Sequence, residues 1–246
     1  RVPVLGQVGI PATGVVAVSM NVTVTRSKVD GSGGYVTVYP CTPTVPNVSS
    51  LNFTTDQTVP NAVIVPVNGP DMCFYVRGNA DLIADVNGWF GSASTFNALA
   101  PSRIADTRVP IGVAKAKVGK LDGTGGALVV PVLGAGGVPP YNVAAVSLNV
   151  TVANSDAPSY GGYVTVYPCG QTPPNASNLN FMKGKVVPNA VIAPVAADGT
   201  VCIYVFGQSD VIVDVNGWFA GGGGFTGMTP ARVSDTRSGI GNVPGR

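Results

Sequence analysis

The chain contains one set of sequence motifs twice, at an almost constant spacing. Gly34–Cys41 (GYVTVYPC) returns letter for letter as Gly162–Cys169, and Asp85–Phe90 (DVNGWF) returns as Asp214–Phe219. The step from Cys41 to Cys169 is only one position shorter than the step from Asp85 to Asp214, and both are about half of the chain. Solenoid repeats have much shorter periods, so this spacing predicts two tandem copies of one domain.

Each copy consists of short, Val-rich runs that alternate between apolar and polar residues. Between Val146 and Val152 the apolar residues alternate with Ser, Asn and Thr, which is typical of a strand with one buried face. The 33 Gly and 21 Pro cluster between such runs, as turn residues do. We therefore expect an all-β protein with two tandem β-sandwich domains of the jelly-roll or immunoglobulin-like type. The expected divisions are a first sandwich at 1–90, a linker at 91–127, a second sandwich at 128–219 and a C-terminal tail at 220–246.

The four cysteines follow the duplication. Cys41 and Cys73 in the first copy match Cys169 and Cys202 in the second. Four cysteines allow three pairings, but the repeat favours one disulfide within each copy, Cys41–Cys73 and Cys169–Cys202. Each bridge would contribute about 3–4 kcal/mol in the chain-entropy model. Disulfides also indicate a location outside a reducing cytosol.

The composition argues against several classes of function. The chain has no His, all 12 acidic residues are Asp, and the net charge is +2. Without His there is no ordinary catalytic triad and no imidazole base, so we expect no enzyme, no cofactor and no metal site. The sequence has no cluster of Lys and Arg that would predict nucleic-acid binding. No apolar run reaches the roughly 18 residues that a membrane helix needs.

A second motif that occurs twice contains two Arg and one Asp in each copy. Pro101–Arg108 (PSRIADTR) returns as Pro230–Arg237 (PARVSDTR), and each copy of the domain also places one Asp within an apolar strand. A carboxylate in such a strand needs a partner. One interpretation is a binding or catalytic carboxylate; the favoured one is a structural clasp between Arg and Asp that fixes the segment onto a sandwich. The members of this clasp would be Asp85, Arg103, Asp106, Arg108, Asp214, Arg232, Asp235 and Arg237.

Tyrosines on one strand of each copy form a possible contact surface. Tyr35 and Tyr39 share a face of the first strand, and Tyr163 and Tyr167 share a face of the second. Such a face could bind sugar rings, contact another subunit, or be the buried second face of a core strand. The sequence alone leaves these three alternatives open.

Taken together, the motifs resemble a known repeat. The order PxRxxDTR, GVPxxxVxAVxLNVT, GYVTVYP, SNLNF, VPNAV and DVNGWF is similar to that of a repeat in large secreted and cell-surface proteins of high-GC Gram-positive bacteria. The resemblance covers nearly the whole chain. It implies an extracellular or cell-surface location and a β-sandwich architecture rather than a reaction. In that repeat the DTR segment comes first, whereas the first copy here lacks its leading segment.

The position of the two DTR segments suggests how the protein works. If each segment serves the sandwich that precedes it, the chain is two closed domains. If each serves the sandwich that follows, Pro101–Arg108 completes the second domain and Pro230–Arg237 is left over for the open edge of another copy. We therefore expect a secreted structural protein whose partners are other copies of itself, joined head to tail in a filament or surface layer. The alternative is a module that binds cell-wall or extracellular glycan.

Overall fold

The structure is a computed structural model that describes residues 1–7, 9–31, 33–113 and 118–222. These residues form strands and no helix, so none of them lies in a helix long and apolar enough to cross a membrane. The strands of the first half are β1 (Val2–Pro3), β2 (Val15–Lys28), β3 (Gly34–Pro40), β4 (Leu51–Phe53), β5 (Val59–Pro66), β6 (Asp71–Arg77) and β7 (Asn79–Gly91). The others are β8 (Phe96–Asp106), β9 (Leu128–Pro131), β10 (Val143–Asp156), β11 (Gly162–Pro168), β12 (Leu179–Phe181), β13 (Val187–Pro194), β14 (Thr200–Phe206) and β15 (Gln208–Ala220).

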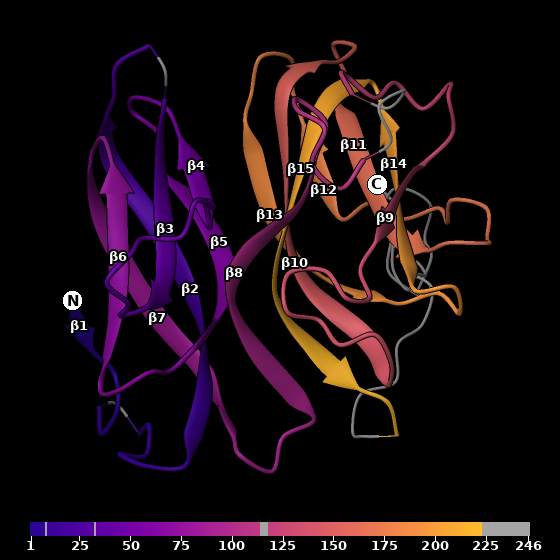
Figure 1. Cartoon of the computed structure of the whole chain (residues 1–246). Coiled ribbons are helices and arrows are strands. Elements are labelled where there is room, and N and C mark those ends of the chain that lie inside the picture. The colour runs from indigo at the N-terminus through magenta and orange to yellow at the C-terminus, as the bar shows by residue number, and fades with distance from the viewer. Residues whose placement is uncertain (8, 32, 114–117, 223–246) are drawn as a thin grey trace, which may run out of the picture.

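The strands build two β-sandwiches that lie side by side (Figure 1). In the first, the sheet β1-β6-β3-β4 packs on the sheet β5-β2-β7. In the second, the sheet β12-β11-β14-β9 packs on β13-β10-β15-β8. Each sandwich has its own apolar core, built from the inward-facing residues of its strands, such as Met20 and Leu51 in the first and Leu148 and Ile203 in the second. The expected fold class is confirmed.

Each sandwich also contains its own disulfide. Cys41 is bonded to Cys73, and Cys169 is bonded to Cys202, as the duplication predicts. In both copies the second cysteine lies opposite the last tyrosine of the GYVTVYP strand, Tyr39 or Tyr167. The bridge therefore ties the loop that follows this strand to the neighbouring strand of the same sheet.

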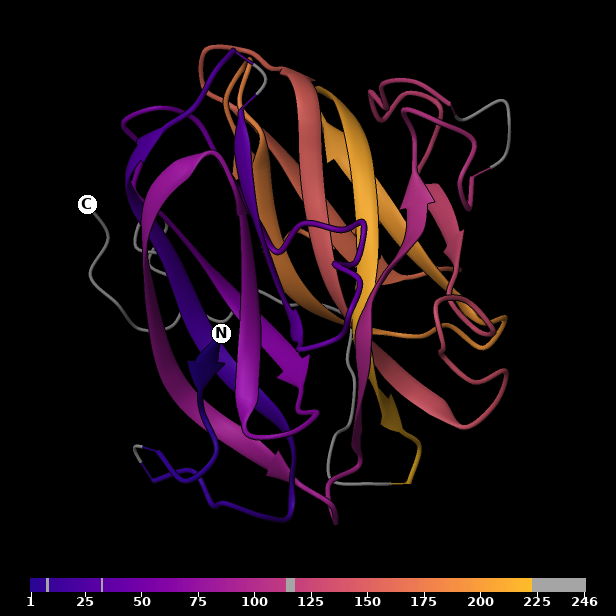
Figure 2. The same cartoon turned by 60° about the vertical axis from the view of Figure 1, so that its left-hand side comes forward.

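The two sandwiches contact each other through the outer faces of the sheets that contain β2 and β10. Phe96 of β8 lies between Phe90 of the first sandwich and Phe219 of the second, with ring centroids 4.6 and 4.9 Å away. At another point of the contact, the side-chain amide of Asn61 in β5 donates to the Oδ1 of Asn149 in β10 at 2.9 Å. In Figure 2 the same two bodies are seen after a turn of 60°. The contact thus has an apolar part around Phe96 and a polar part around Asn61.

Candidate functional site

The first DTR segment is the last part of β8, and β8 belongs to the second sandwich. The strand pairs antiparallel with β15, in a register that places Phe96 opposite Phe219 and Asp106 opposite Ile212. Phe96 fills the space above Gly217, where an added Cβ would lie 2.3 Å from its ring. Of the two assignments that the sequence leaves open, the structure shows the one in which the segment completes the sandwich that follows it.

The charged residues of this segment form a compact cluster with Asp214. Arg103 donates from Nε and Nη2 to the two carboxylate oxygens of Asp214, at 2.9 and 3.5 Å, and from Nη1 to Asp106 at 3.4 Å. Arg108 holds Asp106 from Nε at 2.9 Å, from Nη2 at 2.6 Å and from its backbone N–H at 3.0 Å. Asp106 and Asp214 are both buried. We call these four residues the clasp.

The two carboxylates of the clasp differ in their electrostatic surroundings. Burial on its own raises the pKa of Asp106, but the hydrogen bonds and charge of Arg108, with help from Arg103, outweigh it and lower that pKa below 3.8. Burial raises the pKa of Asp214 above its ordinary value, and Arg103 offsets only part of this effect. The hydrogen bond to Asp106 raises the pKa of Arg108. Because its acids are bonded mainly to guanidinium groups, the clasp has the chemistry of a structural ion-pair network rather than of an acid–base pair.

The threonine of the DTR motif continues this attachment. Thr107 is fully buried, its Oγ1 accepts the backbone N–H of Val211 at 3.0 Å, and it lies 3.3 Å from a carboxylate oxygen of Asp210. The other oxygen of Asp210 accepts the amide of Asn154 at 2.6 Å. Thr107 therefore fixes the end of β8 to β15, whereas the side chains of Asp106 and Arg108 bond to each other within the segment.

Among the described residues, the first sandwich has no counterpart of β8. Its sheet ends at β7, the equivalent of β15, and no described residue pairs with the outer edge of β7. Matched side chains of the two strands differ in exposure: Ile83 is 48% exposed, whereas Ile212, which also borders the first sandwich, is 5% exposed. Trp89 is 45% exposed, whereas Trp218 packs against the core of the second sandwich. We call the unpaired side of β7 the open edge.

The open edge matches the second DTR segment in sequence. Phe225–Arg237 (FTGMTPARVSDTR) repeats Phe96–Arg108 (FNALAPSRIADTR) at the same offset that separates Asp85 from Asp214. Four residues separate the end of β7 from Phe96, and four separate the end of β15 from Phe225. Three candidate clasp residues, Arg232, Asp235 and Arg237, lie outside the described residues, as does the side chain of Asp85.

Only some of the candidate tyrosines are accessible. Tyr39 and Tyr167 are buried, which corresponds to the buried second face among the three alternatives that the sequence leaves open. The reason is that the loop after each strand folds over it: the hydroxyl of Thr37 donates to the carbonyl of Val48 at 2.5 Å, and Thr165 makes the matching bond in the second copy. Tyr35 and Tyr163 stay half-buried, and the ring of each lies beside another tyrosine.

Three residues lie at the contact between the sandwiches, and the sequence did not predict this position for any of them. Asn149 donates to the carbonyl of Ser49 at 2.7 Å, and Asn61 accepts the backbone N–H of Ala190 at 3.2 Å. The backbone N–H of Ser49 also donates to Asp214, which links the clasp to the first sandwich. The alternating pattern around Asn149 marks a polar strand face, and such a face is the usual sign of solvent, so the pattern does not reveal a domain contact.

Comparison with known proteins does not add a family assignment. No protein-family model matches the chain, and no curated protein matches it. Among the described residues, no group of three or more His, Cys, Asp or Glu side chains is placed to hold a metal ion. The candidate site is therefore defined by geometry alone, as the clasp on β15 and the open edge on β7.

Proposed function

We propose that the protein is a structural subunit that assembles head to tail by strand donation. Residues Phe225–Arg237 of one copy add to the open edge of the next copy, as β8 adds to β15 within the chain. The observation that carries this proposal is the difference between the two sandwiches: β15 pairs with a DTR segment, whereas no described residue pairs with that side of the equivalent strand β7. Unpaired strand edges favour the addition of a further strand.

The pairing of β8 with β15 supplies the expected register of the donated strand. The residue pairs between β8 and β15 can be converted to the equivalent pairs between the tail and β7 with the offset that separates Asp85 from Asp214. The converted register places Phe225 opposite Phe90, Ser234 opposite Ala84 and Asp235 opposite Ile83. In this register Phe225 would lie over Gly88, which matches Gly217 in sequence. Arg232 would lie opposite Asp85, so that a second clasp would form between subunits.

A contact of this kind joins two different surfaces of the same subunit. Such a heterologous contact propagates as an open filament unless its rotation closes a ring. The two disulfides are compatible with an extracellular protein. We therefore propose an extracellular filament or surface layer as the assembled form.

A cross-linking experiment tests the donation and its register together. The four native cysteines are in disulfides, so a new thiol has no free native partner. Chains with Ala84→Cys are mixed with chains with Ser234→Cys and oxidised gently; the expected product is a covalent dimer on a non-reducing gel. The matched control replaces Ser234→Cys by Thr229→Cys, a few positions away along the same strand, and should give little dimer. Removal of 225–246 should turn long assemblies, seen by electron microscopy and light scattering, into monomers.

The opposite result is equally definite. A single chain with both Ala84→Cys and Ser234→Cys could close on itself, because the end of β15 and the end of β7 lie on either side of Phe96. An internal cross-link in that chain, with no dimer from the mixed single variants, would mean that the tail fills its own open edge. Polymer that survives removal of 225–246 would also refute the proposal.

A second candidate function is glycan adhesion, and one observation favours it. Tyr160 is 77% exposed and lies beside Phe206, which in turn stacks on Tyr163 at 5.1 Å, while Tyr204 also lies beside Tyr163. Exposed aromatic rings with polar tips are suited to contact ligands. This function predicts a monomer that binds cell-wall glycan and loses the binding with Tyr163→Ala. Tyr39→Phe, a change at a buried tyrosine, is the control.

A further inference from the structure

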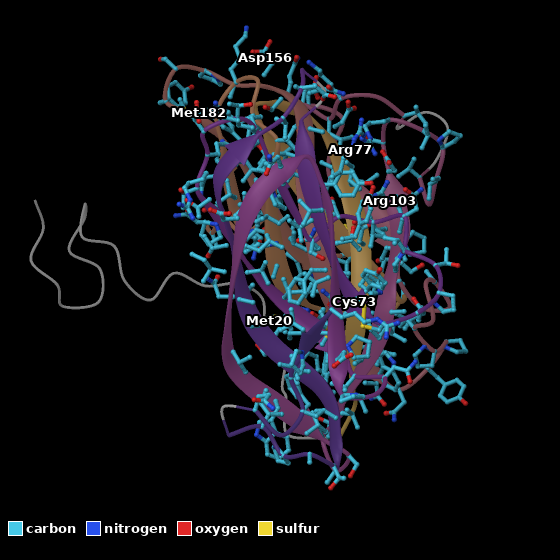
Figure 3. The ribbon with its side chains drawn as sticks, turned by 90° about the vertical axis from the view of Figure 1, so that its left-hand side faces the viewer. Met20, Cys73, Arg77, Arg103, Asp156 and Met182 are labelled. Atoms are coloured by element: carbon cyan, nitrogen blue, oxygen red, sulfur yellow. A yellow bond between two sulfur atoms is a disulfide. The ribbon has the colours of Figure 1, made fainter. Side chains whose placement is uncertain are left out.

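A groove of about 410 Å³ runs between the two sandwiches at the end where the clasp lies. Its walls come from both halves of the chain: β3, β4, the loop before β4 and the end of β6 on one side, and β8, β10 and β15 on the other. Figure 3 shows Arg77 and Arg103 close to each other on one side of the molecule. The lining residues are Tyr35, Asn47, Val48, Ser49, Asn52, Arg77, Arg103, Arg108, Ala153, Asn154, Val186 and Ile212.

The charges of this groove are unevenly arranged. Arg77, Arg103 and Arg108 all line it, whereas no Asp is among the described residues that do so. The carboxylates of Asp106 and Asp214 lie behind the arginines and are almost inaccessible. Arg108 uses Nε and Nη2 for Asp106, so its Nη1 group is not needed for that pair, and its side chain is 41% exposed. A ligand in the groove would therefore meet guanidinium groups, with the carboxylates that pair with Arg103 and Arg108 behind them.

The two copies of the domain differ at the position of Arg77, one of the three arginines that line the groove. Arg77 of the first sandwich corresponds to Phe206 of the second, where the ring stacks on Tyr163. Around it the copies agree: Tyr35 matches Tyr163, and Asn52 matches Asn180. The guanidinium thus replaces an aromatic ring only in the copy whose strand end borders the groove.

We propose that this groove binds the anionic group of an acidic polysaccharide. A carboxylate of a uronic acid or a phosphate of a polyol-phosphate chain would accept hydrogen bonds from Arg77 and Arg108, since guanidinium groups fit both anions in a bidentate manner. Arg103, held by Asp214, forms the base of the groove. A neighbouring sugar could form hydrogen bonds with the side-chain amides of Asn47, Asn52 and Asn154. It could also stack on the ring of Tyr35. This site is independent of strand donation and of the rings around Tyr163.

The test uses the full chain and three defined polymers. Polygalacturonate carries carboxylates, poly(glycerol phosphate) carries phosphates, and dextran carries no charge. We expect at least one polyanion to bind in isothermal titration calorimetry at low ionic strength, dextran not to bind, and Arg77→Phe to weaken the affinity about tenfold or more. Arg77→Phe installs the residue that the second copy has at this position, so folding should be unaffected, as circular dichroism and thermal unfolding would show.

A matched variant separates a specific site from general charge attraction. Arg26→Phe also removes one positive charge and adds one ring, but Arg26 is exposed, pairs with Asp81 and does not line the groove. It should leave the affinity unchanged. Equal weakening by Arg26→Phe and Arg77→Phe, binding of dextran as tight as that of the polyanions, or no binding of either polyanion to the folded chain would overturn the proposal. Which polyanion binds distinguishes the carboxylate source from the phosphate source.

Discussion

Replacement of Arg103 by methionine tests the clasp directly. Arg103 supplies two hydrogen bonds to Asp214 and one to Asp106, while Asp106 keeps its three bonds from Arg108. The loss therefore falls mainly on Asp214, which is 2% exposed and would retain chiefly the backbone N–H of Ser49. Removing one partner of a buried pair costs about 3–5 kcal/mol, so we expect this drop in the unfolding free energy of the second sandwich at pH 7.

The measurement needs a signal from the second sandwich alone. Trp89 lies in the first sandwich and Trp218 in the second, so urea unfolding followed by tryptophan fluorescence in a Trp89→Phe background reports on the second. The control is Arg26→Met: its pair with Asp81 is on the surface, and such pairs contribute less than about 1 kcal/mol. The double variant Arg103→Met with Asp214→Val leaves no unpaired charge and should recover most of the stability.

The pH dependence of this loss provides a second criterion. Burial raises the pKa of Asp214, and removal of Arg103 takes away the main interaction that lowers it. A carboxyl whose folded pKa is raised stabilises the fold when protonated and loses that contribution as the pH rises through the folded value. The cost of Arg103→Met should therefore be smaller at pH 4 than at pH 7. A cost no larger than that of Arg26→Met, or one equal at both pH values, would refute the reasoning.

Two further predictions concern the second carboxylate and the disulfides. The pKa of Asp106 is lowered, so the ionised carboxylate stabilises the fold above about pH 3.8, and this stabilisation is lost as the pH falls through the lower pKa of the folded state. The variant Asp106→Asn should be less stable than the unchanged chain at pH 7 but should lose less stability on acidification. Urea titrations from pH 2.5 to 6 would measure this difference. An equally steep acid loss in this variant would contradict the assignment. Replacing both Cys169 and Cys202 by serine should lower the stability of the second sandwich by about 3–4 kcal/mol, since the bridge joins residues 33 positions apart, and should leave the first sandwich little changed. Equal losses in both sandwiches by calorimetry would show that they do not unfold independently.

The sequence by itself determined the β-architecture, the duplication and the disulfides. These features depend on neighbouring residues or on comparison of the two copies: alternation around Val150 gives a strand with a buried face, and the match of Cys41 with Cys169 selects one pairing. The clasp was also foreseeable as a set of residue types, because Asp214 lies within an apolar strand and needs a charged partner. Its actual pairs were not, because several combinations satisfy the same chemistry.

The tertiary structure alone decided which sandwich β8 completes, which tyrosines are accessible and where the groove lies. The burial of Tyr39 depends on a loop that folds over its strand, and the polar face around Asn149 is covered by the other sandwich rather than by water. Ile83 and Ile212 occupy equivalent strands, yet one is exposed and the other buried. This difference in exposure cannot be predicted from the local sequence, because it depends on which other segments pack against each strand.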